Sequence, residues 1–265
     1  MRLVDTHCHL DGHYFPDGPE GPIKRARAAG VVGFMVIGVG DTMQPAREAV
    51  AIAQAYPSFV AAAVGIHPHD ASTFDADAER ELDSLGRSRE VVAIGEAGLD
   101  YHYDNSPRDV QRDVFARAIS LAKQIGKPLV IHTRSAANDT LDLMESEGAR
   151  EVGGIIHCFS EDWAFAARAL DLGFYISFSG IVTFKNATSI HEVAARAPLE
   201  RILVETDSPY LAPIPFRGKP CEPAMVVHTA RRVAELRGIT LEALAESTSE
   251  NAERLLGRTF AMIET

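Results

Sequence analysis

Two histidines near the start of the chain, His7 and His9, stand two residues apart in a short apolar segment. Side chains at positions i and i+2 of a β-strand point to the same face, so both imidazoles can reach one cation. Imidazole is also the commonest metal ligand among side chains. A His-x-His pair arises by chance in ordinary surface and core positions, so the pair needs partners before it indicates a metal site.

Four further residues with metal-binding side chains stand at the ends of apolar runs far apart in the sequence. They are Glu96, His132, His157 and Asp207. Each alone could be structural, as a hydrogen-bonded histidine or as the cap of the following helix. Together with the first pair they supply four imidazoles and two carboxylates, enough for two cations if one carboxylate bridges. The residue pattern therefore predicts a dinuclear centre.

The mixture of nitrogen and oxygen ligands suits zinc, manganese, iron, nickel or cobalt better than calcium. We therefore expect two divalent ions as cofactors, drawn from this group or magnesium. The spacing of the ligands does not choose among these metals.

Eight short apolar runs rich in β-branched residues predict strands that position these ligands. Their ranges are 2–7, 32–38, 59–65, 91–96, 128–132, 154–158, 174–178 and 201–206. Amphipathic stretches lie between them, and the clearest runs from Pro107 to Ile125. We place Pro107 at its first helical position and Gly126 as its stop, with Val110, Val114, Ala118, Leu121 and Ile125 forming one buried stripe.

Eight β/α units predict an α/β fold, a (β/α)8 TIM barrel, with residues 1–265 forming one domain. A doubly wound open sheet is the competing architecture. The polar residues favour the barrel, because its strand ends converge on one mouth, whereas in an open sheet they would be strung along an edge.

Bulk composition limits the classes of function. The chain has 265 residues, 46% of them hydrophobic, and a formal net charge of −11, so it offers no global attraction to nucleic acid or anionic membrane. Three cysteines (Cys8, Cys158 and Cys221) argue against a disulfide framework and favour a cytoplasmic location. No apolar run is long enough to span a bilayer. We expect no membrane association and no obligate protein partner.

The chain resembles the TatD family of metal-dependent hydrolases, within the wider group of amidohydrolase-like barrels, from Asp5 to about Leu256. The resemblance rests on seven motifs in this order: Asp5-Thr6-His7-Cys8-His9-Leu10, Gly65-Ile66-His67-Pro68-His69, Gly95-Glu96-Ala97-Gly98-Leu99-Asp100-Tyr101, Ile131-His132-Thr133-Arg134, His157-Cys158-Phe159-Ser160, Glu205-Thr206-Asp207-Ser208-Pro209 and Arg217-Gly218-Lys219-Pro220-Cys221-Glu222-Pro223. Glu161 and Cys221 depart from the family pattern, in which Gly and Asn are usual, and we expect these changes to affect substrate preference. Cys221, in a proline-rich loop, is expected to be exposed.

The resemblance implies a division of the ligands between two ions. One ion would be held by His7, His9 and Asp207, the other by His132 and His157, with Glu96 bridging. The residues alone leave the bridging carboxylate open between Glu96 and Asp207. Glu205, two residues before Asp207, should lie on the same side of its strand, either as a catalytic group or as a buried carboxylate that orients a ligand.

Two such cations lower the pKa of a bound water and neutralise charge on a phosphoryl or carbonyl oxygen, so the site predicts hydrolysis. We expect Asp207 to act as general base and His67 to contact the phosphate or assist the leaving group. His69 is expected to be a loop hydrogen-bonding residue.

The resemblance implies deoxyribonuclease activity, often 3′ to 5′ on single strands, so the expected partner is DNA as single strands or 3′ ends. Against a net charge of −11, phosphate must be drawn by the metals and by a few rim cations, for which the sequence offers Arg134, Arg217 and Lys219. The alternative enzyme is a hydrolase of an ester or amide bond, acting on an aminoacyl group or a small molecule. A non-catalytic metal-binding scaffold is a further alternative, against which Glu205 and His67 argue.

Overall fold

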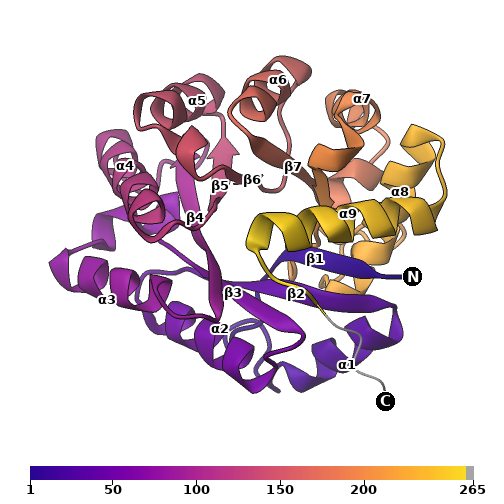
Figure 1. The fold of residues 1–265 in the computed structure, drawn as a ribbon, viewed down its shortest axis with the longest axis horizontal. Coiled ribbons are helices and arrows are strands. Elements are labelled where there is room, and N and C mark those ends of the chain that lie inside the picture. The colour runs from indigo at the N-terminus through magenta and orange to yellow at the C-terminus, as the bar shows by residue number, and fades with distance from the viewer. Residues whose placement is uncertain (261–265) are drawn as a thin grey trace.

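The computed structural model describes residues 1–260, and within them eight parallel strands pair in chain order from β1 to β8. The strands form the wall of a barrel and the helices surround it (Figure 1). The strands are β1 Leu3–Cys8, β2 Val31–Gly38, β3 Val60–Val64, β4 Val91–Asp100, β5 Leu129–Arg134, β6 Gly154–Ile156, β7 Phe174–Phe178 and β8 Ile202–Val204. The helices are α1 Glu20–Ala28, α2 Gln44–Ala55, α3 Ala76–Gly86, α4 Arg108–Ile125, α5 Ala137–Ser146, α6 Trp163–Asp171, α7 Thr188–Arg196, α8 Val226–Arg237 and α9 Leu241–Leu256.

The barrel closes where the segment after β8 meets β1. Cys8 and Ser208 form a parallel bridge, and the backbone N–H of Asp207 donates to the carbonyl of His7 over 2.9 Å. The carboxylate of Asp5, fully buried at this seam, accepts the N–H of Thr206 at 2.9 Å and its hydroxyl at 2.6 Å. This closure confirms the predicted eight-stranded barrel and excludes the open sheet.

One end of the barrel is plugged by the end of α9 and the chain that follows it. Leu256 and Phe260 pack among the inward-facing side chains near the strand starts, with Val4, Val32 and Met35. A Cβ at Gly33 would lie 2.1 Å from Cδ1 of Phe260, so only glycine leaves room for this ring. The open end of the barrel is therefore the one at which the strands finish.

Two strand boundaries differ from the sequence prediction in a way that matters for the site. β4 continues to Asp100 instead of ending at Glu96, whereas β8 ends at Val204, before Thr206. The helix over 107–125 begins at Arg108 with Pro107 as its cap, and Gly126 ends it with φ 67° as predicted. The predicted buried stripe of this helix is partly wrong. Val114 and Ala118 are buried as predicted, and the other buried residues of the helix are Gln111, Phe115, Ile119 and Ala122.

No helix within residues 1–260 is long and apolar enough to cross a membrane. Of the cysteines, Cys8 packs in the layer between sheet and helices and donates through Sγ to the carbonyl of Met35. The expectation that Cys221 is exposed is wrong, because its side chain is fully buried and its N–H donates to the carbonyl of Pro209.

Candidate metal centre

The carboxylate of Glu96 lies at the centre of a cluster of imidazoles at the open end of the barrel. Its Oε1 atom is 2.8 Å from Nε2 of His157, 2.9 Å from Nδ1 of His132 and 3.4 Å from Nε2 of His67. Its Oε2 atom is 3.4 Å from Nε2 of His7. The two oxygens therefore face different groups of nitrogen donors, which come from four different strand ends.

An irregularity in β4 points Glu96 at this cluster. The register between β4 and β5 shifts between Ile94 and Ala97, so Glu96 stands in a bulge that redirects its side chain. Beyond the bulge the strands approach closely: a Cβ at Gly98, whose φ is 148°, would lie 1.9 Å from the carbonyl oxygen of His132. The glycines of this motif thus allow β4 to carry both Glu96 and Asp100.

His7 and His9 converge on Asp207, as their spacing predicts. Oδ1 of Asp207 is 3.6 Å from Nε2 of His7 and 3.8 Å from Nε2 of His9. Asp207 itself has φ 58°, a conformation rare for residues with a side chain and frequent at functional sites. The barrel seam holds this turn in place through the bond from Asp207 to His7 and the clamp of Asp5 on Thr206.

In both His132 and His157, the ring nitrogen that faces away from Glu96 lies close to a second carboxylate. Nε2 of His132 is 3.1 Å from Oδ2 of Asp100, while its Nδ1 faces Glu96. Nδ1 of His157 is 3.3 Å from Oε1 of Glu205, while its Nε2 faces Glu96. Each ring therefore presents one nitrogen to the cluster and the other to an orienting carboxylate, an arrangement typical of metal-binding histidines.

Glu205 is fully buried and also fixes the backbone after β6. Its Oε1 accepts the N–H of Cys158 at 2.7 Å, and Cys158 has φ 45°. Asp100 is equally buried, and its Oδ1 accepts the N–H groups of His102 and Tyr103 at 2.9 and 3.0 Å. Glu205 is thereby anchored to the residue after His157, and Asp100 to the loop that follows its own strand.

His67 is held in one tautomer by its own loop. Its Nδ1 atom accepts the backbone N–H of His69 at 3.1 Å, so in the neutral ring the proton resides on Nε2. That Nε2–H can donate a hydrogen bond within the cluster, where Oε1 of Glu96 lies 3.4 Å away. His69, expected to bond within the loop, does so through its N–H and in addition places Nε2 at 2.9 Å from Oδ2 of Asp100.

The donor atoms fit a metal centre. Three groups have ligand atoms within 4.8 Å of one another: His7–His9–Asp207, His7–His157–Glu205 and His67–Glu96–His132. His7 is fully buried, yet neither of its ring nitrogens has a hydrogen-bond partner within residues 1–260. Buried polar atoms without partners are costly, and a divalent cation bound at Nε2 would supply the missing interaction.

Electrostatics favour the protonation state that metal binding requires at His9, His67 and Glu96. Burial lowers the pKa of His132 and His157, but the neighbouring carboxylates outweigh it and raise the pKa of both rings. Burial lowers the pKa of His9 to about 3 and that of His67 to about 4, so both rings are neutral at pH 7. Burial raises the pKa of Glu96, but the charge of His157 and hydrogen bonds from His132 and His157 outweigh it and hold that pKa well below its ordinary value. Burial raises the pKa of Asp207 to about 6.

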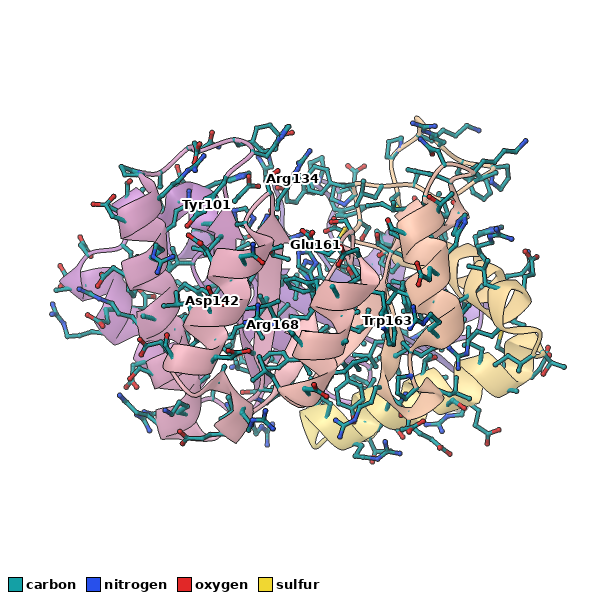
Figure 2. The ribbon with its side chains drawn as sticks, turned by 90° about the horizontal axis from the view of Figure 1, so that it is seen from above. Tyr101, Arg134, Asp142, Glu161, Trp163 and Arg168 are labelled. Carbon is teal, nitrogen blue, oxygen red and sulfur yellow. The ribbon has the colours of Figure 1, made fainter. Side chains whose placement is uncertain are left out.

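The predicted rim cations lie in loops or strand ends at the same mouth. Arg134, the last residue of β5, appears at the upper edge of Figure 2, with α9 at the opposite end of the barrel. Arg217 and Lys219 are exposed in the loop after β8. Within residues 1–260, none of the three has a carboxylate within 4 Å, although Arg134 covers the ring of Tyr103 at 4.8 Å and Arg217 that of Phe184 at 4.6 Å.

Sequence reasoning missed Asp5 as the clamp of the barrel seam and Asp100 as the partner of His132. Asp100 stands four positions after Glu96, so on one continuous strand both side chains would point to the same face of the sheet. The sequence did not indicate that β4 continues past Gly95 and Gly98 to Asp100. Glu161 lies half-buried in the loop after β6, near the mouth in Figure 2, and burial raises its pKa.

Comparison with known proteins gives concordant matches along the chain. The protein family described as TatD related DNase matches residues 4–257. A Bacillus subtilis (strain 168) protein, "Uncharacterized metal-dependent hydrolase YabD", is 43% identical over 254 residues, covering 96% of this chain and 98% of that protein. The "Uncharacterized metal-dependent hydrolase TatD" of Mycobacterium tuberculosis is 40% identical, covering 96% of this chain and 98% of that protein. The crystal structure of YJJV, a TatD homolog from Escherichia coli K12, superposes with a TM-score of 0.88 at 28% identity, covering 96% of this chain and 97% of that one.

Proposed function

The chain belongs to the TatD related DNase family and is a metal-dependent hydrolase of that family, and from this premise we propose that it hydrolyses phosphodiester bonds of DNA. The preferred substrates in this proposal are single strands and 3′ ends. The family description supports the choice of DNA. The cations Arg134, Arg217 and Lys219 near the mouth, which have no carboxylate within 4 Å among residues 1–260, support an anionic substrate.

We propose that two divalent ions bind at the cluster. His7, His9 and Asp207 would hold one ion, His132 and His157 the other, and Glu96 would contact both. The observation that carries this proposal is the position of Glu96, with one oxygen 3.4 Å from His7 and the other within 3 Å of both His132 and His157. When bound, such ions lower the pKa of water and stabilise negative charge on a phosphoryl oxygen.

The residues around the ions have separate tasks in the proposed reaction. Asp207 takes the proton of the attacking water, because its side chain reaches solvent at 13% exposure whereas Glu96 is 5% exposed and Glu205 fully buried. His67 donates its Nε2–H to a phosphate oxygen, since its Nδ1 is occupied by the N–H of His69. Asp100 and Glu205 keep His132 and His157 in position.

Three substrates assayed side by side test the proposal. An end-labelled single-stranded oligodeoxynucleotide, an aryl phosphodiester and an aryl acyl ester report DNA, general phosphodiester and carboxylic ester hydrolysis. The proposal predicts turnover of the first two and much slower turnover of the acyl ester. In Glu96→Ala and Asp207→Ala both activities should be lost. Faster acyl ester hydrolysis, or full DNA turnover by either variant, would contradict it.

A further inference from the structure

Exposed aromatic side chains stand beside the metal centre. Within residues 1–260, the large apolar side chains that are exposed are Met1, Tyr103, Tyr210 and Ile214. Met1 lies at the plugged end of the barrel, before β1, whereas the other three lie in loops at the open end. Tyr103 is 54% exposed and Tyr210 is 48% exposed. Exposed aromatic rings gathered at one mouth are typical of binding surfaces.

On one side of the mouth, Tyr210 and Tyr14 form a pair that contacts the ligand His9. Their ring centroids are 5.6 Å apart, and the hydroxyl of Tyr210 donates to that of Tyr14 over 2.7 Å. The ring of His9 is 5.7 Å from Tyr14 and 6.3 Å from Tyr210. Tyr14 comes from the loop after β1 and Tyr210 from the loop after β8, which are neighbouring loops across the barrel seam.

On the other side, Tyr103 stands in the loop after β4. Its ring is 5.2 Å from that of His69, whose ring is 6.3 Å from that of His132. The guanidinium of Arg134 lies 4.8 Å from the centroid of Tyr103. In an eight-stranded barrel β4 stands opposite β8, and Figure 1 shows β4 and β1 on different sides of the barrel. The two aromatic groups therefore flank the metal centre.

We propose that Tyr210 with Tyr14, and Tyr103 with Arg134, form two surfaces that stack unpaired nucleobases on either side of the bond to be cleaved. The inference rests on the proposed function and names the residues that would recognise single strands. An aromatic side chain can stack only on a base whose face is free. In a duplex the faces of the bases are covered by neighbouring bases.

The charge of the protein supports this assignment. The formal net charge is −11, and only a few cations lie near the mouth. Contacts to phosphates therefore supply less binding energy here than they do in a basic nucleic-acid-binding protein. Stacking of a base on an aromatic side chain contributes about 1–3 kcal/mol and does not depend on net charge. The guanidinium of Arg134 lies over one face of the Tyr103 ring, so in this proposal a base stacks on the opposite face of Tyr103 or on the guanidinium plane itself.

Trp163 does not belong to these surfaces. It begins α6 and packs against the hydrophobic core, and Figure 2 shows it below the level of Arg134 and Glu161. Its environment is that of a packing residue between α6 and α7.

Equilibrium binding of the metal-loaded protein to a short phosphorothioate oligonucleotide tests the inference, because slow cleavage leaves the complex intact. A second oligonucleotide lacks bases at the nucleotides next to its terminal linkage. Tyr210→Ala and Tyr103→Ala should each weaken binding of the complete strand about 5- to 150-fold, the equivalent of about 1–3 kcal/mol. Neither variant should lose more than twofold on the abasic strand.

Two variants separate stacking from a structural role. Tyr210→Phe and Tyr103→Phe keep the ring and should bind the complete strand within about twofold of the parent protein. Ile214→Ala removes an exposed apolar side chain from the same loop as Tyr210 and should leave the ratio of complete to abasic affinity unchanged.

The inference is overturned if the tyrosine-to-alanine variants keep the parent ratio of complete to abasic affinity. It is also overturned if a blunt duplex binds as tightly as the single strand and is equally weakened by these substitutions. Failure of the proposed function would appear in a different measurement, as the absence of aryl phosphodiester turnover. That substrate contains no nucleobase, so its hydrolysis does not depend on stacking. The two failures are therefore distinguishable.

Discussion

The Nε2 atom of His132 lies 3.1 Å from Oδ2 of Asp100, while Nδ1 on the other side of the ring faces Glu96 at 2.9 Å. An Nε2–H donated to the carboxylate leaves Nδ1 as the nitrogen free for a metal. Although burial raises its pKa, hydrogen bonds from His132, the N–H of Tyr103 and His69 hold the pKa of Asp100 below its usual range. Asp100 therefore stays ionised and fixes the ring that would bind the second ion.

Replacing this carboxylate should weaken metal binding. Asp100→Asn removes the charge that orients His132, and we expect metal affinity to fall about 10- to 100-fold, as for other carboxylates behind a ligand. Competition with a chelator of known affinity measures the effect. Asp104→Asn is the matched control, because Asp104 is exposed and pairs with Arg108. Equal metal affinity in the Asp100 and Asp104 variants would show that Asp100 does not contribute to metal binding.

Glu205 should act through His157 and not on substrate. Its side chain is fully buried and its Oε1 is engaged by His157 and the N–H of Cys158. We expect Glu205→Gln to lower metal affinity by roughly tenfold, with most of the lost turnover restored when metal is raised to saturation. Turnover that stays abolished at saturating metal, with ions bound in full, would assign Glu205 a direct catalytic role instead.

Arg217 should contribute to the attraction of the anionic substrate. It is exposed in the loop after β8 and has no carboxylate within 4 Å among the residues described. We expect Arg217→Ala to weaken binding of a single-stranded oligonucleotide and to reduce the slope of log affinity against log salt by about 0.7. Arg150→Ala removes the same charge from η2 (Ala149–Glu151), before β6 at the plugged end of the barrel, and should keep the parent slope. An identical slope in both variants would rule out a phosphate contact by Arg217.

The plugged end of the barrel should determine stability without affecting the metal centre. Phe260 is fully buried among the inward-facing residues. Its replacement by Ala should cost about 3–5 kcal/mol of unfolding free energy and lower the melting temperature by on the order of 10 °C. Metal stoichiometry at 20 °C should remain that of the parent protein, with Ile214→Ala as an exposed control. Loss of bound metal in folded Phe260→Ala would show that the two ends are coupled.

Strand order and the gathering of the candidate ligands at one mouth could be predicted because β-branched runs and polar residues at their ends are local signals. His7 and His9 converge as their two-residue spacing requires. The bulge at Glu96 and the extension of β4 to Asp100 could not be predicted from the sequence, because they depend on how β4 pairs with β5. The same holds for Asp5, whose role arises only when β1 meets Thr206 across some 200 residues of chain.

The central claim is that Glu96 joins two metal sites, and metal analysis after chelation and add-back tests it most directly. We predict two divalent ions per chain in the parent protein, one in His9→Ala and one in His157→Ala, with the remaining ion bound by different ligands in the two variants. Their metal spectra after cobalt substitution should therefore differ. A single ion in the parent protein, or loss of the same ion from both variants, would contradict the account.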